Sequence, residues 1–318
     1  MDKVRWYQTI KLDGVDAVYE DTQRAKSKFW DKGKWDNFIE PLLPEHRGTF
    51  IEIGCNAGLM LKLAKDVGFR DVIGIDSSKT RVKQANLYKN HNKYDYKILH
   101  KEVGRDFDIK ELPLADVVLI ANTHYYLKLC DLIELLDQLK GRTRYCIVVS
   151  AKAHFLGDRA RHFLDYIRGC FKDWPEVKLI EGLDIADDPA PRKEMYGVLF
   201  KGNLEAYPIE ADDKEIDKND TSVYVAIREL TRMVFNNEKF KIEDTMLYKY
   251  FKRTGPKWMA EGLMPHMERK IDLIKDVQKN GLRQPIFFKK DLIKLYDGVH
   301  RYIMAQELGH KHILIRRI

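Results

Sequence analysis

The chain has 318 residues, of which 44% are hydrophobic, and it carries a formal net charge of +7. This apolar content excludes a disordered chain, and the length predicts two packed domains of roughly 150 residues each. No run approaches the ~20 apolar residues of a membrane span, and residues 1–10 lack the apolar core of a signal peptide. We therefore expect a soluble, cytoplasmic protein with no membrane span.

Cysteine spacing bears on metal binding. None of the cysteines forms a C-x-x-C pair, which is the spacing of the common zinc motifs. We expect reduced thiols and no metal site. The cysteines are Cys55, Cys130, Cys146 and Cys170.

Aromatic residues are concentrated before the first expected strand, between residues 6 and 35. A helix is expected over residues 36–43, with a proline as punctuation after it. Trp30 and Trp35 are candidates for stacking on a sugar or base of a substrate. The alternative is that these tryptophans pack a helix onto the sheet.

Residues 49–58, which read TFIEIGCNAG, carry the most informative pattern of the chain. An apolar, β-branched run over residues 50–53 breaks at Gly54, and residues 59–65 return to helical spacing. Gly54 and Gly58 remove Cβ atoms where the backbone turns tightly and lets a ligand approach. The pattern predicts a strand-to-helix crossover with a ligand near the helix N-terminus.

Asp76, in the run VIGIDSS, lies at the carboxyl end of the next expected strand, which covers residues 71–75. An acid at this place in a βαβ unit is the usual partner of ribose hydroxyls. A dinucleotide site has the pattern G-x-G-x-x-G, whereas position 56 here is Asn. An NAD enzyme and a glycine turn without a ligand are the alternatives.

The pattern E-x-G-C-N-A-G resembles the first motif of class I S-adenosylmethionine-dependent methyltransferases. The resemblance implies an α/β fold with a Rossmann-like seven-stranded sheet and S-adenosylmethionine as the cofactor. It also implies that Glu52 orients the amino-acid end of the cofactor and that Glu102 contacts its adenine. The expected cofactor-binding residues are Glu52, Gly54, Cys55, Asn56, Gly58, Asp76, Glu102 and Asn122.

Further apolar runs complete the expected sheet by about residue 203. The last strand is expected to be antiparallel and at the edge. The remaining strands are expected at residues 96–99, 115–120, 145–150, 177–181 and 196–201, with helices at 80–90 and 127–139.

Catalytic candidates follow the fourth strand, because ligands in open α/β sheets bind outside the carboxyl ends of the strands. His124 is a candidate general base for a hydroxyl acceptor, since its unperturbed pKa is about 6.5. Alternatively, it hydrogen-bonds the loop or packs under the cofactor. Tyr125 and Tyr126 are expected mainly to pack, with Tyr125 a candidate for substrate contact. Arg159, in the basic loop 152–162, is a candidate for binding an anionic acceptor; the alternative is a solvated helix start.

Residues 5–150 also resemble one branch of the methyltransferase family. In order and spacing, WYQTIKLDG, FW-x-KGKW, IEIGCNAG, GIDSS and THYYL resemble the wobble-uridine tRNA carboxymethyl-transferring enzymes and their sugar-modifying relatives. The resemblance implies that the aromatic N-terminal segment caps the cofactor site and contributes to the substrate pocket.

Past residue 203 the composition becomes acidic and poor in large apolar residues, which predicts a linker before a helix over residues 223–235. The later runs GLRQPI and DGVHR, followed by a strand at 312–316, resemble the ParB/sulfiredoxin fold. Val299 stands where sulfiredoxin chemistry needs a cysteine, which disfavours that activity. The resemblance implies a phosphate or nucleotide site, with Mg²⁺ as an option, at Gln284, Asp297, Gly298, His300 and Arg301; the alternative is a turn that only stabilises the fold.

The sequence therefore predicts a methyltransferase domain with an aromatic cap at residues 1–205 and a smaller α+β, ParB/sulfiredoxin-like domain at residues 206–318. We expect methyl transfer from S-adenosylmethionine to a polar acceptor, foremost a hydroxyl of a sugar or sugar phosphate in a glycan. The second domain is expected to handle a phosphate or nucleotide, with a kinase among the options. One alternative is a tRNA-modifying methyltransferase; another is a non-enzymatic cofactor sensor with a nucleotide-switch or DNA-binding second domain.

Overall fold

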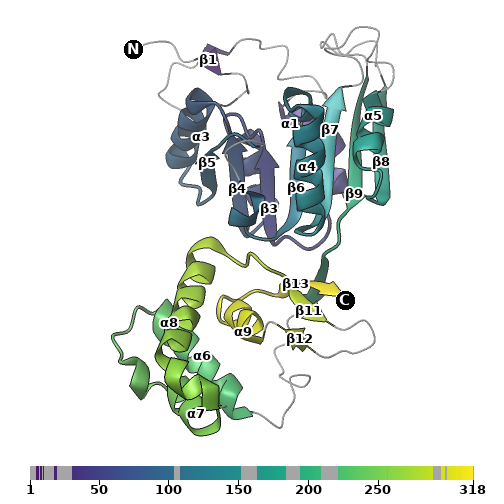
Figure 1. Cartoon of the computed structure of the whole chain (residues 1–318). Coiled ribbons are helices and arrows are strands. Elements are labelled where there is room, and N and C mark those ends of the chain that lie inside the picture. The colour runs from purple at the N-terminus through teal and green to yellow at the C-terminus, as the bar shows by residue number, and fades with distance from the viewer. Residues whose placement is uncertain are drawn as a thin grey trace. The chain divides into compact units, whose positions relative to one another are not determined.

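The structure, a computed structural model, divides the chain into two compact units, each described here by itself (Figure 1). The N-terminal unit comprises Met1–Ile109 and Ala115–Asn203, and the C-terminal unit comprises Lys110–Leu114 and Leu204–Ile318. Among the described residues, no helix is both long and apolar enough to cross a membrane. The described residues are 5–6, 8, 10, 18–19, 31–103, 108–151, 163–183, 194–208, 221–255, 257–288, 295–297 and 299–317.

A seven-stranded sheet in the order β5-β4-β3-β6-β7-β9-β8 forms the centre of the N-terminal unit. Neighbours from β5 to β7 are parallel, and β9 is antiparallel to both β7 and β8. The prediction of a seven-stranded α/β sheet is confirmed. The strands are β3 (Thr49–Ile53), β4 (Asp71–Asp76), β5 (Lys97–His100), β6 (Ala115–Ala121), β7 (Thr143–Ala151), β8 (Glu176–Leu183) and β9 (Glu194–Lys201).

The position of β9 differs from the prediction. β9 is antiparallel as expected, but it lies between β7 and β8, so β8 is the edge strand. Residues 195–200 are all buried, whereas every residue of β8 whose burial the structure describes is exposed or half-buried. An inner place for β9 therefore buries the more apolar of the two strands.

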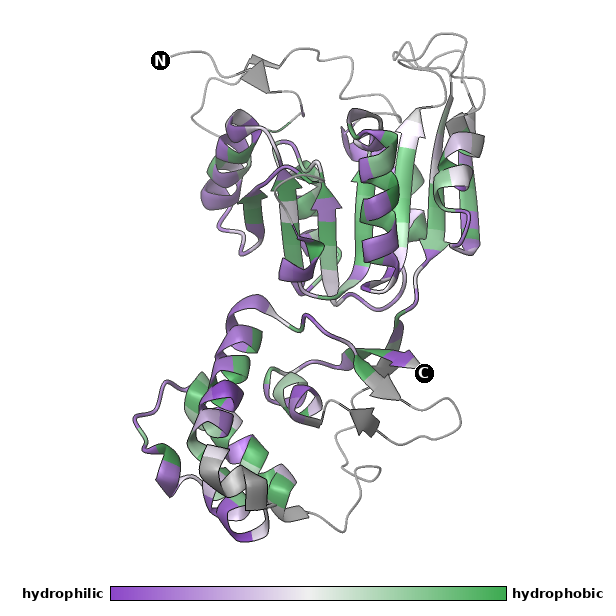
Figure 2. Cartoon of the chain, viewed as in Figure 1, coloured by the Kyte–Doolittle hydropathy of each residue, from purple (hydrophilic) through white to green (hydrophobic). Residues whose placement is uncertain are grey.

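Helices flank the sheet, with α4 drawn in front of it and α1 behind it in Figure 1. Figure 2 shows largely hydrophobic strands and hydrophilic outer faces on α3 and α4, as amphipathic packing requires. In α2, five of eight residues are buried, among them Met60 and Leu61. The helices are α1 (Asp31–Lys34), α2 (Leu59–Asp66), α3 (Lys79–His91), α4 (Leu129–Lys140) and α5 (Phe163–Cys170).

The helix expected over residues 36–43 is part of a longer segment of mixed type. α1 continues directly into a π-helical turn, Trp35–Ile39, and a 3₁₀ turn, Glu40–Leu42. Nε1 of Trp35 donates to Oε2 of Glu40 at 3.0 Å, five residues along, which matches the spacing of the π turn. The segment packs closely on β9, because a Cβ at Gly197 would lie 2.5 Å from the carbonyl oxygen of Phe38.

The C-terminal unit has a four-stranded sheet in the order β10-β13-β11-β12 and its own apolar core. Part of the predicted linker belongs to this sheet as β10 (Glu205–Pro208), and residues 209–220 lie outside the described part of the chain. The unit contains α6 (Thr221–Phe235), α7 (Met246–Thr254), α8 (Lys257–Asn280), β11 (Ile286–Phe288), β12 (Leu295–Asp297), α9 (Val299–Glu307) and β13 (His312–Arg317).

The local elements expected at the end of the chain are present in this unit. α8 ends before Gly281, whose φ is 76°, and β11 follows Pro285. β12 ends at Asp297, α9 begins at Val299, and the chain returns as β13. The identity of the unit as a ParB/sulfiredoxin-like domain stays a prediction.

Candidate cofactor site

A cavity of about 430 Å³ opens at the carboxyl ends of β3, β4 and β6. Ile53, Asp76 and Ala121, the last residues of those strands, line it. From β3 the chain proceeds outward to β4 and β5, then crosses to β6 on the other side of β3. The cavity therefore lies at the topological switch point, where open α/β sheets bind their ligands.

The glycine-rich turn after β3 is fixed to the neighbouring strand. The N–H groups of Gly54 and Cys55 both donate to the carbonyl of Ile75, at 2.8 and 3.0 Å. Gly54 has a φ of 77°, and a Cβ there would lie 2.2 Å from Oγ1 of Thr123. Only glycine fits this position, because both the backbone conformation and the space exclude a side chain.

Asp76 has both carboxylate oxygens positioned by backbone amides. Oδ2 accepts the N–H of Asn56 at 2.8 Å, and Oδ1 accepts the N–H of Ser78 at 2.8 Å. Each carboxylate oxygen has further acceptor capacity. Asp76 can therefore accept hydrogen bonds from hydroxyl groups of a ligand and still keep the two backbone hydrogen bonds that orient it.

Three buried oxygens in the cavity lack a hydrogen-bond partner within the described part of the chain: Oε2 of Glu52, Oδ1 of Asn56 and Oδ1 of Asn122. Buried polar atoms without partners are rare and costly. Asn56 and Asn122 also have left-handed backbones, with φ values of 51° and 55°. Such strain in non-glycine residues is concentrated at functional sites. A ligand with several hydrogen-bond donors fits this arrangement.

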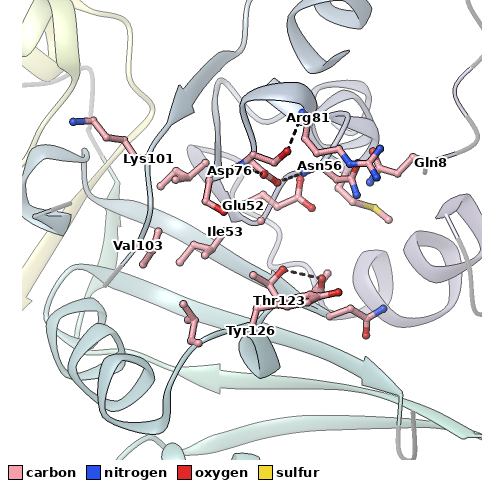
Figure 3. A pocket seen from close by; sticks show the side chains of 18 of the residues that line it. Gln8, Glu52, Ile53, Asn56, Asp76, Arg81, Lys101, Val103, Thr123 and Tyr126 are labelled. Carbon is pink, nitrogen blue, oxygen red and sulfur yellow. Dashed lines mark hydrogen bonds between the residues drawn. The ribbon is translucent and has the colours of Figure 1, made fainter. Parts of the chain in front are cut away.

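Figure 3 shows how the side chains are divided around the cavity. Glu52, Asn56 and Asp76 lie together on one side, and Thr123 and Tyr126, from the segment after β6, lie on the other. Thr123 is held by its hydroxyl, which donates to the carbonyl of Ala121 at 3.1 Å.

Glu52 is only 2% exposed. Burial raises the pKa of its carboxyl well above the ordinary value; the positive charge of Lys34 opposes this shift, and the negative charge of Asp76 adds to it. A cationic group on a ligand would favour the ionised form of Glu52. Four carboxyl groups line the cavity (Asp31, Glu52, Asp76, Glu102) against three cations (Lys34, Arg81, Lys101). This balance does not favour a pyrophosphate.

The cavity brings together most of the predicted cofactor-binding residues. Cys55 does not line it, since it is fully buried, and burial raises the pKa of its thiol. Gly58 is the residue before α2, with a φ of 85°, and shapes the turn from outside the lining. The predicted residues that line the cavity are Glu52, Gly54, Asn56, Asp76, Glu102 and Asn122.

His124 is placed differently from its predicted role as a base. It is 1% exposed and is not among the cavity residues. Burial lowers the pKa of its imidazole to about 3. This burial outside the cavity lining agrees better with a packing role for His124 than with that of a base, and the role of His124 stays a prediction.

Trp35 is also placed differently from its predicted contact with substrate. It is 1% exposed, and its ring lies 6.2 Å from that of Phe50 in β3. The tryptophan therefore packs the N-terminal helical segment onto the sheet. Trp30, Arg159 and the side chain of Tyr125 lie outside the described part of the chain.

Sequence reasoning missed several cavity residues that come from other parts of the chain. Gln8 and Lys34 precede the first strand of the sheet, and both lie in motifs of the N-terminal segment, WYQTIKLDG and FW-x-KGKW. Arg81, in α3, and Lys101, after β5, add positive charge. Only the fold brings these residues to the glycine-rich turn.

The residues predicted to bind phosphate in the C-terminal unit are partly brought together. Nη1 of Arg301 donates to the carbonyl of Pro285 at 2.6 Å, next to Gln284, which is exposed. Burial lowers the pKa of His300 to about 3, assisted by the nearby Lys270, His266 and Arg301, so His300 is neutral at pH 7. Gly298 and the side chain of Asp297 lie outside the described part. No cluster of His, Cys, Asp and Glu side chains suited to a metal occurs among the described residues.

No protein-family model and no curated protein matches the chain. Similar solved structures include a SAM-dependent methyltransferase from Aquifex aeolicus (17% identity, 57% of this chain and 93% of that one, TM-score 0.41). They also include N-methyltransferase NodS from Bradyrhizobium japonicum WM9 in complex with S-adenosyl-L-homocysteine (15% identity, 49% of this chain and 78% of that one, TM-score 0.38). A third is TehB from Haemophilus influenzae (12% identity, 48% of this chain and 57% of that one, TM-score 0.38). Because these TM-scores are low, the function of the chain has to be inferred from its own residues.

Proposed function

We propose that the N-terminal unit binds S-adenosylmethionine and transfers its methyl group to a polar acceptor. The observation that carries this proposal is the set of three buried oxygens, from Glu52, Asn56 and Asn122, that have no hydrogen-bond partner among the described residues and surround the cavity that also contains Asp76. S-adenosylmethionine offers donors to match them: an ammonium group, two ribose hydroxyls and an adenine amino group. When bound, this cofactor supplies an electrophilic methyl group on a sulfonium.

Each cavity residue has a role that its surroundings support. Glu52, buried at the carboxyl end of β3, is suited to the ammonium group, which would hold it ionised. Asp76, oriented by two backbone amides, is suited to the ribose hydroxyls. Glu102 and Val103, which follow β5, are assigned to the adenine. The unpartnered oxygens of Asn56 and Asn122 complete the acceptor set.

The same surroundings argue against a dinucleotide. A pyrophosphate at this turn would lie near the carboxyl groups of Glu52 and Asp76, and an ionised carboxylate repels a phosphate. The turn also has Asn56, not glycine, at its centre. S-adenosylmethionine carries no phosphate, so it avoids this repulsion.

For the acceptor we propose a hydroxyl of a sugar or sugar phosphate in a glycan, with a tRNA nucleotide as the alternative. The support is the sequence resemblance over residues 5–150 to enzymes that modify wobble uridine and sugars. Tyr126, which is 77% exposed and lines the cavity, offers an aromatic ring for stacking at the rim.

The C-terminal unit is proposed to handle a phosphate or nucleotide, with Mg²⁺, in line with its GLRQPI and DGVHR runs. Calorimetric titration of the full chain with ATP, ADP and CTP in the presence of magnesium tests this part. Heat that is lost in Arg301→Ala supports a nucleotide site. No heat with any nucleotide would contradict the proposal.

The experiment for the N-terminal unit is transfer of a radiolabelled methyl group from S-adenosylmethionine to cell glycan and RNA fractions. Label in the glycan fraction supports the proposal, and label in RNA would replace the acceptor with tRNA. Label in neither, despite tight cofactor binding, would indicate a sensor. Glu52→Gln is the negative control, because it removes the proposed ammonium partner with little change in volume.

A further inference from the structure

The segment from Lys79 to Lys101 contains α3, the turn after it and the edge strand β5, and it carries nearly all of the excess charge of the chain. It holds seven of the 56 Lys and Arg residues but one of the 49 Asp and Glu residues, so the rest of the chain is close to neutral. The single acid, Asp95, pairs with Lys65, outside the segment, at 2.7 Å. The seven cations are Lys79, Arg81, Lys83, Lys89, Lys93, Lys97 and Lys101.

The first cations of this segment do not stabilise the helix that bears them. The first turn of α3 contains no acid, whereas Lys79 and Arg81 lie in it, at the positive end of the helix dipole. Lys79 and Lys83, four residues apart on the helix, also repel each other. Both effects cost stability, so helix formation does not account for the charge. An anionic partner does account for it, because the same charges attract an anion.

The lysines lie on an outward-facing surface. The residues of α3 that are buried are Gln84, Ala85 and Tyr88. Lys79 and Lys83 are exposed, and Figure 2 shows the hydrophilic outer face of this helix. Lys93, in the turn after α3, and Lys97, in β5, are exposed as well. An extended partner can therefore contact the helix, the turn and the strand together.

An exposed apolar side chain lies among these lysines. Leu87 is 51% exposed and follows Lys83 by four residues in α3, as Lys83 follows Lys79. Residues spaced four apart lie on one face of a helix. This arrangement suits a lipid surface, because the leucine can enter the boundary between headgroups and acyl chains while the lysines stay at the phosphates. The backbone of a nucleic acid offers Leu87 no apolar medium.

The chemistry of the cations also favours lipid over nucleic acid. Six of the seven are lysines, which attract phosphates as point charges, and Nη1 of the one arginine, Arg81, donates to Oε1 of the buried Gln84 at 3.1 Å. No exposed aromatic ring that could stack on a base occurs in the segment, since Tyr88 and Tyr96 are buried and Tyr94 is half-buried. The charge can therefore attract phosphates, but the segment has no means of reading bases.

We propose that α3, the turn after it and β5 form a docking surface for an anionic lipid bilayer. The lysines attract the acidic headgroups, and Leu87 enters the boundary of the acyl chains. Arg81 and Lys101 also line the cofactor cavity, as Figure 3 shows. Docking therefore brings the mouth of the cavity to the headgroups, where a lipid-carried sugar presents its hydroxyl groups. That consequence rests on the proposed function, whereas binding to the bilayer does not.

Flotation of the full chain with lipid vesicles tests the docking surface. Vesicles of phosphatidylcholine alone are compared with vesicles of equal parts phosphatidylcholine and phosphatidylglycerol. Wild type should partition onto the anionic vesicles and not onto the neutral ones. This binding should be lost at about 1 M NaCl, where the Debye length is about 3 Å.

Two exposed lysines that do not line the cavity provide the first variant, Lys79→Gln with Lys83→Gln. Its partition coefficient onto anionic vesicles should fall about tenfold or more. The matched control is Lys172→Gln with Lys178→Gln, which removes the same charge. Both of these lysines are exposed; one precedes β8 and the other lies in it, at the opposite edge of the sheet. The control should bind vesicles like wild type.

Leu87→Gln keeps the charge and separates a bilayer from other polyanions. It should weaken binding to anionic vesicles about fivefold, because an apolar contact is lost. The midpoint of urea unfolding should stay the same, since Leu87 is exposed. Bulk tRNA, titrated at the same salt concentration, is the competing ligand and should bind more weakly than the anionic vesicles.

Three results would overturn the inference. Equal partition onto neutral and anionic vesicles, or none onto either, shows that the surface does not bind an anionic bilayer. Equal losses in the two lysine pairs show that net charge, and not this surface, is responsible. Tighter binding of tRNA, or vesicle binding that is unchanged in Leu87→Gln, assigns the lysines to a polyanion other than a bilayer.

Titration with S-adenosylhomocysteine keeps these outcomes separate from the proposed function. Lys79→Gln with Lys83→Gln should bind this ligand as wild type does, because neither lysine lines the cavity. A wild-type chain that binds S-adenosylhomocysteine but no vesicle contradicts the docking surface alone. A chain that binds anionic vesicles but not S-adenosylhomocysteine contradicts the proposed function and leaves the docking surface supported.

Discussion

The backbone N–H of Asn56 donates to Oδ2 of Asp76 at 2.8 Å. This hydrogen bond joins the glycine-rich turn after β3 to the acid that ends β4, 20 residues later in the chain. The two sequence features that indicate a cofactor are thus one physical unit. Because Ser78 N–H holds the other carboxylate oxygen, the acceptor geometry is set by the protein itself.

Gly54→Ala should damage both stability and cofactor binding. A Cβ at Gly54 would lie 2.2 Å from Oγ1 of Thr123, in a backbone with a φ of 77°. Left-handed strain and overpacking together should cost about 3 kcal/mol of unfolding free energy. Urea unfolding gives the stability, and titration with S-adenosylhomocysteine gives the affinity.

The control for this prediction is Gly68→Ala. Gly68 also has a positive φ, 93°, but a Cβ there meets no atom within 4 Å. This variant should lose only about 1 kcal/mol, from backbone strain, and should bind the cofactor normally. Equal losses in the two variants would show that the contact with Thr123 is unimportant.

Glu52 should make both stability and cofactor binding depend on pH. Burial raises its folded-state pKa above the unfolded value of about 4.3, so the folded chain holds the proton more tightly. The stabilisation is fully present below the unfolded pKa and is lost as pH rises through the raised folded-state pKa. Glu52→Gln mimics the protonated form, so its free energy of unfolding should increase relative to that of wild type as pH rises above about 4.

Cofactor binding gives the complementary readout for Glu52. An ammonium group favours the ionised carboxyl, so binding should release a proton from any Glu52 still protonated. Calorimetry in buffers of different ionisation enthalpy measures that proton release. The Glu52→Gln variant should release no proton at this site and should bind the cofactor more weakly. Proton release that is unchanged in Glu52→Gln would assign the titration to another group.

Trp35→Ala should destabilise the N-terminal unit, not selectively weaken acceptor binding. Removal of this buried side chain leaves a cavity against Phe50, which should cost about 4 kcal/mol. Tyr126→Ala is the matched comparison, because Tyr126 lies at the cavity and is 77% exposed. It should leave the unfolding free energy within about 0.5 kcal/mol of wild type and raise the acceptor KM. The opposite pattern would return Trp35 to the substrate site.

His124 should affect acid stability and not the pH profile of catalysis. Its folded-state pKa, about 3, lies below the unfolded value of about 6.5. Its contribution to stability is therefore present above about pH 6.5 and is lost as pH falls through the folded-state pKa. Between pH 6.5 and pH 5 the loss should be about 2 kcal/mol, and His124→Asn should remove that part of the acid sensitivity. An inflection near pH 6.5 in kcat/KM that disappears in His124→Asn would contradict this assignment.

The sequence was sufficient for the parts of the fold that depend on local pattern. The run at residues 50–53 is β-branched and apolar and forms β3, and Gly54, Asn56 and Asp76 meet at the cavity because one βαβ unit places them there. The inner position of β9 was not predictable from local pattern, because strand order depends on which faces helices cover. His124 follows β6, but a 3₁₀ turn, His124–Tyr126, contains it, and the side chain is buried away from the cavity.

Gln8 and Lys34 were missed for a different reason. Their contacts join segments 51 residues apart in one case and depend on a π-helical turn in the other. Neither feature leaves a periodic signal in the sequence. The motifs WYQTIKLDG and FW-x-KGKW contain both residues, but the aromatic residues and not the polar ones dominate these motifs.

Calorimetric titration of the full chain with S-adenosylhomocysteine and, separately, with NAD⁺ tests the cofactor assignment most directly. S-adenosylhomocysteine should bind, and NAD⁺ should not. Asp76→Asn should weaken the binding of S-adenosylhomocysteine about tenfold or more, since it removes a charged group that accepts hydrogen bonds from the hydroxyls. Asp71→Asn, at the exposed amino end of the same strand, should bind like wild type. Tighter binding of NAD⁺, or an Asp76→Asn variant that binds S-adenosylhomocysteine as well as wild type does, would contradict the assignment of this site to S-adenosylmethionine.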